Sequence, residues 1–167
     1  MIRLVNQVVA YIAFVAVLGL FSVWPGYRLL DNEQAIVSLT FSHAGQRVEE
    51  CRRLTQEELN ALPPNMRKPD QCPRERHDIE VELRLDDAVL YTQTLSPSGL
   101  WKDGKATVYS RSTIDAGEHD LFVGMNDSGR GTGFDYVLQR ELAIEPGRNL
   151  VVTFDDLHGI FVIEQAR

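Results

Sequence analysis

The chain has 167 residues, of which 44% are hydrophobic and 25% are charged, and its formal net charge is −7. This is enough for one domain with a real hydrophobic core, and the sequence shows no internal repeat or low-complexity tract. The acid surplus argues against nucleic-acid binding, because phosphate backbones repel carboxylates.

An uncharged apolar run lies near the start of the chain, from Val8 to Val23, with Arg3 before it and Trp24 and Tyr27 after it. With the residues just before it, the run reaches the roughly 20 residues that an α-helix needs to cross about 30 Å of hydrocarbon. Trp24 and Tyr27 suit the headgroup layer, where an amphipathic ring keeps one edge in water. We therefore expect residues 1–30 to form a transmembrane anchor in contact with membrane lipid.

The alternative for this segment is a secretory signal peptide, which ends in small residues ahead of its cleavage site. Here the apolar run ends in Phe21, Ser22, Val23, Trp24 and Pro25. These side chains are too bulky for signal peptidase, so the sequence favours an uncleaved anchor. The balance of flanking positive charge leans weakly toward a cytoplasmic N-terminus.

The two cysteines, Cys51 and Cys72, lie in the remainder of the chain and lack the spacing of a zinc site. A cysteine pair is typical of an oxidising compartment. We expect a disulfide between them and place the domain in the bacterial periplasm, anchored in the inner membrane. The alternative is two reduced, buried thiols.

Residues 31–167 carry the alternation of half-buried strands, with one interruption. The predicted strands are 36–42, 79–85, 89–94, 106–113, a segment around 121–125, 134–142, 150–154 and 160–165. Turn residues separate them, so we expect a mainly β domain, an antiparallel β-sandwich of immunoglobulin-like character. The interruption, about 48–76, is rich in proline and polar residues. Thr55 and Glu58 have the spacing of a capping box, which predicts a short helix from Gln56 to about Leu62.

Few residues suggest chemistry. Four histidines stand one per segment, and the two methionines of the soluble part stand far apart, which disfavours a copper site. The glycine-rich stretch 126–133 lacks the helix and the Lys-Ser/Thr of a phosphate loop, so it is predicted to be a hairpin loop in which Arg130 can contact a partner. No nucleophile motif is present. The sequence therefore predicts no enzyme activity, no metal and no cofactor.

The expected function follows from architecture. We expect a non-catalytic accessory or structural subunit of a larger integral membrane complex, plausible hosts being respiratory electron-transport oxidoreductases, with Leu100 and Trp101 as an aromatic anchor for protein–protein interaction. The acid surplus of residues 78–167 would also attract a basic periplasmic cytochrome c. The alternatives are a membrane-anchored periplasmic binding module, which exposed aromatics on one sheet face would favour, and a copper assembly factor, which clustered histidines would favour.

Overall fold

The computed structural model describes residues 1–24, 26 and 30–166. The chain divides into two compact units, Met1–Asp31 and Asn32–Arg167. Each unit is described by itself below. Tyr27, predicted to lie at the membrane interface, falls outside the described residues.

The first unit contains one helix, α1 (Ile2–Val23), which has 22 residues and a mean hydropathy of 2.2 over its most apolar window. At 1.5 Å per residue it is about 33 Å long, which matches the hydrocarbon thickness of a bilayer. None of its residues is buried within the protein, and Val8 is 54% exposed and Val23 80% exposed. Trp24 ends the helix in an extended conformation. The helix is thus a candidate membrane anchor by length and composition.

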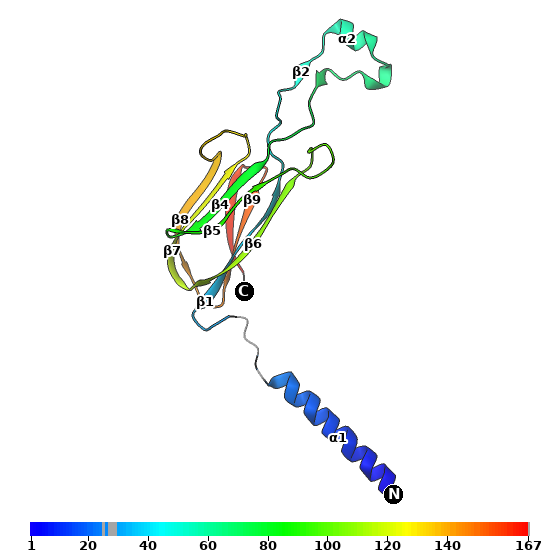
Figure 1. Cartoon of the computed structure of the whole chain (residues 1–167), viewed down its shortest axis with the longest axis vertical. Coiled ribbons are helices and arrows are strands. Elements are labelled where there is room, and N and C mark those ends of the chain that lie inside the picture. Colours follow the sequence, from blue (N-terminus) through cyan, green and yellow to red (C-terminus); the bar gives the residue numbers. More distant parts are fainter. Residues whose placement is uncertain (25, 27–29, 167) are drawn as a thin grey trace. The chain divides into compact units, whose positions relative to one another are not determined.

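In the described part of the second unit, eight strands form two four-stranded sheets (Figure 1). The first sheet has the order β10–β9–β1–β6, with β10 (Ile160–Ala166), β9 (Asn149–Asp155), β1 (Gln34–His43) and β6 (Ala106–Asp115). The second has the order β5–β4–β7–β8, with β5 (Ala88–Leu95), β4 (Ile79–Leu85), β7 (Gly117–Asn126) and β8 (Tyr136–Ile144). The predicted mainly β architecture is confirmed.

A single hydrophobic core lies between the two sheets and takes residues from both. Leu39 of β1, Leu83 of β4 and Val123 of β7 are completely buried. They point into the core because successive side chains of a strand point to opposite faces, and each of these residues lies on the face that meets the other sheet. Burying each such side chain contributes about 1.5–3 kcal/mol.

The strand pairing differs from the sequence prediction in one place. β1 and β9 run parallel, from Ile36 beside Asn149 to Leu39 beside Val152, whereas the other neighbours in the two sheets are antiparallel. The predicted antiparallel arrangement was therefore wrong for the pair β1 and β9. Alternation determines which face of a strand is buried but says nothing about its neighbour, and the long connection between β1 and β9 permits parallel pairing.

Phe134, predicted to belong to the strand 134–142, lies outside that strand. The structure begins β8 at Tyr136, and the Phe134 ring packs against Phe122 with 5.7 Å between ring centroids. Phe122 and Gly124 alternate with Leu121, Val123 and Met125, which belong to the core, so they lie on the outer face of β7. A Cβ on Gly124 would stand 2.7 Å from the Phe134 ring. The Phe134 ring can therefore pack against β7 at this point because Gly124 has no side chain.

Residues 48–76, which we call the finger, extend from the end of the sandwich where β1 ends and β4 begins (Figure 1). The finger contains α2 (Gln56–Ala61), η1 (Pro64–Met66) and a two-residue antiparallel pair that the sequence did not predict, β2 (Arg52–Arg53) with β3 (Asp70–Gln71). The predicted capping box of Thr55 and Glu58 is present, and Cys51 and Cys72 form the predicted disulfide. The short helix and the disulfide are confirmed.

Candidate functional site

The topology gathers several connections at one end of the sandwich. His43 at the end of β1 lies beside Ala106 at the start of β6, Asn126 at the end of β7 lies beside Glu80 of β4, and Asp155 lies beside Ile160. Loops 96–105 and 127–135, turn 156–159 and residues 43–47 therefore meet there, and we call this group the loop end. The chain comes into the sandwich at the opposite end, where Gln34 pairs with Asp115.

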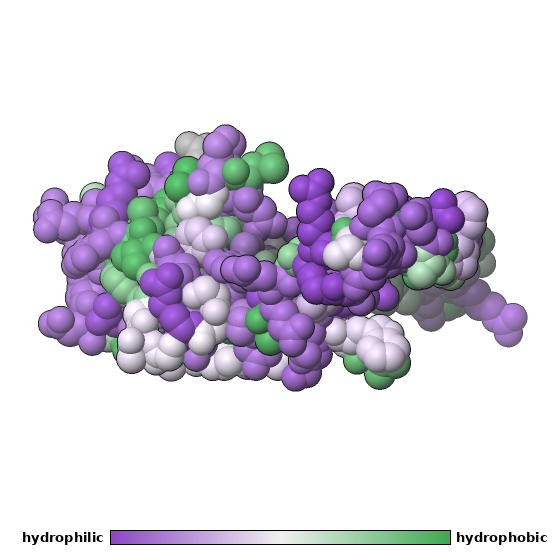
Figure 2. All heavy atoms as spheres, turned by 90° about the horizontal axis from the view of Figure 1, so that it is seen from above, coloured by the Kyte–Doolittle hydropathy of each residue, from purple (hydrophilic) through white to green (hydrophobic). Residues whose placement is uncertain are grey.

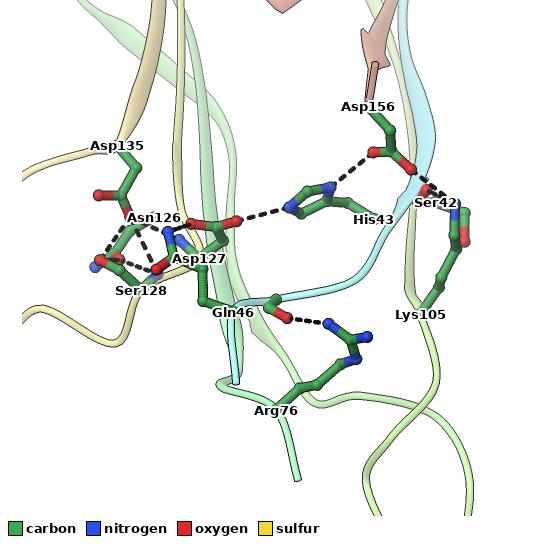
Figure 3. Close-up of polar contacts among 11 residues, drawn as sticks. Ser42, His43, Gln46, Arg76, Lys105, Asn126, Asp127, Ser128, Asp135 and Asp156 are labelled. Carbon is green, nitrogen blue, oxygen red and sulfur yellow. Dashed lines mark hydrogen bonds and ion pairs between the residues drawn. The ribbon is translucent and has the colours of Figure 1, made fainter. Parts of the chain in front are cut away.

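A buried charged network lies beneath the loop end (Figure 3). The His43 ring lies between two carboxylates, with Nε2 2.8 Å from Asp127 Oδ2 and Nδ1 2.7 Å from Asp156 Oδ1. Gln46 donates a hydrogen bond to the other oxygen of Asp127, and the Lys105 ammonium lies 2.7 Å from the other oxygen of Asp156. Asp127 is only 2% exposed. The network joins residues that are 84 and 113 positions apart in the chain.

Each ring nitrogen of His43 lies within hydrogen-bond distance of a carboxylate oxygen, so the ring bridges Asp127 and Asp156. Burial alone would raise the pKa of Asp156, but hydrogen bonds from Lys105 and His43 outweigh burial and lower it. A buried ion pair adds little net stability, whereas removing one partner leaves an uncompensated charge and costs about 3–5 kcal/mol. The network thus locks the connections together.

Loop 127–135 is closed by a second carboxylate, that of Asp135. One of its oxygens accepts the backbone N–H groups of Asp127 and Ser128 and the Ser128 hydroxyl. The other lies 2.6 Å from the Arg130 guanidinium. Burial raises the pKa of Asp135, but these hydrogen bonds and Arg130 outweigh burial and lower it. Arg130, predicted to contact a partner, is therefore ion-paired within its own loop, although its side chain remains 56% exposed.

Loop 96–105 displays two large apolar side chains to solvent: Leu100 is 90% exposed and Trp101 is 67% exposed. The residues after them are held by Arg76, whose backbone N–H donates to Lys102 O and whose Nε donates to Asp103 O. The Arg76 guanidinium also donates to Gly45 O at 2.8 Å (Figure 3). Leu100 and Trp101 therefore project from a fixed loop.

Three ion pairs lie at the loop end, near Leu100 and Trp101. Arg74 lies 2.7 Å from Asp103, and the Lys105–Asp156 and Arg130–Asp135 pairs likewise join opposite charges. Seen from above, the surface is mostly hydrophilic, with apolar residues interspersed (Figure 2). The pairing reduces the positive charge that Arg74, Lys105 and Arg130 would offer to anionic lipid or nucleic acid.

The rings of the remaining histidines make other contacts. His119 lies 2.9 Å from Asp86 and also contacts Asp115 O, whereas His158 lies 2.6 Å from Asp155. The His77 ring packs against Gly129. Within residues 1–24, 26 and 30–166, no three or more His, Cys, Asp or Glu side chains are arranged to hold a metal ion.

The sequence predicted some of these residues and missed others. Leu100, Trp101 and Arg130 all lie at the loop end, as the topology brings their loops together. His43, Asp127 and Asp156 were missed. One signal was available: His43 continues the inward-facing series of Leu39 and Phe41, and a buried histidine requires partners. Its partners come from distant segments and have no local signature.

No protein-family model matches the chain, and no curated protein shows a significant match. The proposal below rests on the geometry.

Proposed function

We propose that this protein is a non-catalytic accessory or structural subunit of a bacterial inner-membrane complex, with its sandwich on the periplasmic face. The observation that carries the proposal is the exposed Leu100–Trp101 pair on a loop held by Arg76. Exposed aromatic side chains on fixed loops are typical anchors of protein interfaces, because little conformational entropy is lost when they dock.

The first unit supports the membrane part of the proposal. We propose that α1 spans the inner membrane with a cytoplasmic N-terminus, that Trp24 lies in the outer headgroup layer, and that the segment stays uncleaved. The Cys51–Cys72 disulfide supports an oxidising compartment. The two packed sheets support an immunoglobulin-like sandwich, a fold often used to present loops to partners.

We further propose that the host is a respiratory oxidoreductase, in which small single-span subunits cover or organise the outer face. The acid surplus of residues 78–167 supports steering of a basic soluble partner, such as a periplasmic cytochrome c, toward this host. The shared part of these proposals is a protein partner at the loop end.

Co-purification tests the proposal. The full chain, tagged at its C-terminus, is extracted from membranes in mild detergent, and the proteins that migrate with it are quantified. Trp101→Ala is compared with Tyr109→Ala, because Tyr109 is also exposed (69%) but projects from β6. We expect a stoichiometric membrane complex with the wild type and Tyr109→Ala, and about 30-fold weaker association with Trp101→Ala, which corresponds to about 2 kcal/mol. A monomer without partners would refute the proposal.

A further inference from the structure

The finger is ordered although it has no core. None of residues 48–76 is buried. Local bonds hold it instead: the Cys51–Cys72 disulfide, hydrogen bonds from Arg52 to Glu58 and Gln71, and the bond from Leu54 N to Pro69 O. These bonds hold the apolar side chains of the finger in place while they stay exposed to water. In a globular domain, burial in a core would fix them instead.

These apolar side chains surround an open hollow of about 320 Å³. Leu54, Leu62 and Met66 supply its apolar wall, and Met66 is 60% exposed. The polar members of its lining are Glu58, Lys68, Asp70 and Gln71. This volume lies at the lower end of the roughly 300–1,000 Å³ of small-molecule pockets, and it is large enough to receive one large side chain.

The finger is physically joined to the loop that carries Trp101. Arg74, in the segment that leads from the finger back to the sandwich, forms an ion pair with Asp103. Arg76 donates hydrogen bonds to the backbone oxygens of Lys102 and Asp103. A partner seated on Leu100 and Trp101 would therefore meet a surface continuous with the base of the finger.

Resting on the proposed function, we propose that the docking surface has two parts, and that the finger hollow receives an apolar side chain of the same protein partner that binds Trp101. The charges favour a protein as the occupant. Glu58, Lys68 and Asp70 carry both signs, and Glu58 is neutralised by Arg52 at 2.9 Å. Such a lining complements the mixed polar rim of a protein interface rather than a row of phosphates.

Photo-cross-linking in intact membranes gives the first test. A benzoyl-phenylalanine is placed in the full chain at position 66, at position 101, or at position 60, which lies on the exposed part of α2 away from the hollow lining. We expect positions 66 and 101 to capture the same protein, identified by mass spectrometry, and position 60 to capture much less of it. Capture of lipid alone, or of a different protein, at position 66 would overturn the inference.

Association with that protein gives the second test. Met66→Glu places a charge in the hollow, whereas Asn60→Glu adds the same charge to the finger outside it. Both positions are exposed, so neither variant disturbs a core. We expect about tenfold weaker association for Met66→Glu and wild-type association for Asn60→Glu. Wild-type association of Met66→Glu with loss in Trp101→Ala overturns this inference but leaves the proposed function standing. Wild-type association of both Met66→Glu and Trp101→Ala overturns this inference and the proposed function together.

Discussion

Replacing His43 by Gln tests the network beneath the loop end. The variant removes the ring that bridges Asp127 and Asp156 while it retains a hydrogen-bond donor of similar length. The Gln side chain has one amide nitrogen in place of two ring nitrogens, so it cannot reproduce the contacts to both carboxylates. The Asp127 side chain is 3% exposed and keeps the hydrogen bond from Gln46. Breaking a buried pair costs about 3–5 kcal/mol. We expect the lower value, about 3 kcal/mol, because the Asp156 side chain is 35% exposed and solvent screens that half of the network.

The measurement is urea denaturation of the full chain in mild detergent, followed by circular dichroism of the β domain. A loss of about 3 kcal/mol raises the unfolded fraction roughly 100-fold. The control is His119→Gln, since His119 also bonds a carboxylate, but that carboxylate, Asp86, is 54% exposed. We expect a much smaller loss there. Adding Asp127→Asn to His43→Gln should recover part of the stability, because the unpaired charge is then gone. Equal stability of the two histidine variants would refute the reasoning.

Three further predictions concern single elements. The pKa of Asp135 is lower in the folded state than its ordinary value of about 3.8, so the ionised carboxylate stabilises the fold above that value. This stabilisation is lost as the pH falls through the lowered pKa. In an acid titration, Asp135→Asn should therefore flatten the decline in the free energy of unfolding between about pH 5 and 2. Cys51→Ser should speed hydrogen exchange in the finger but leave the sandwich strands protected, and global unfolding would contradict this. Gly124→Ala should lower the free energy of unfolding by about 1–3 kcal/mol, because the added Cβ meets the Phe134 ring. Gly131→Ala is the control, since a Cβ there meets no other atom within 4 Å. Equal denaturation midpoints of the two variants would exclude the clash.

The sequence predicted the strands well because their signal is local. Leu39 and Phe41 alternate with Thr40 and Ser42, and one buried face is enough to produce that pattern. The capping box of Thr55 and Glu58 is equally local, since both partners lie within one turn.

Local sequence patterns of this kind could not predict contacts between distant segments of the chain. The parallel pairing of β1 with β9 joins segments whose separate alternation is the same in either orientation. His43 meets Asp127 and Asp156 only after three connections have been brought to one end of the sandwich. Phe134 packs on the outer face of β7, where Gly124 has no side chain. In each case the deciding partner lies in another segment of the chain.

The last prediction links the network to the docking surface. Arg76 bonds Gly45 O next to the network and Asp103 O in the Trp101 loop, so it connects the fixed base to the displayed pair. Arg76→Gln removes the guanidinium but keeps the backbone bond to Lys102 O. We expect the sandwich to stay folded while association with the partner falls about tenfold, because a loosened loop must be ordered on binding.

Arg74→Gln is the matched control for this variant, since Arg74 pairs with Asp103 of the same loop through a side chain that is 72% exposed. An exposed pair of this kind contributes about 0–1 kcal/mol, so its loss should change association little. If Arg76→Gln binds the partner as tightly as Arg74→Gln does, the fixed geometry of Leu100 and Trp101 is unimportant for docking. Their apolar surface alone would then account for the interaction, and the buried network would serve stability only.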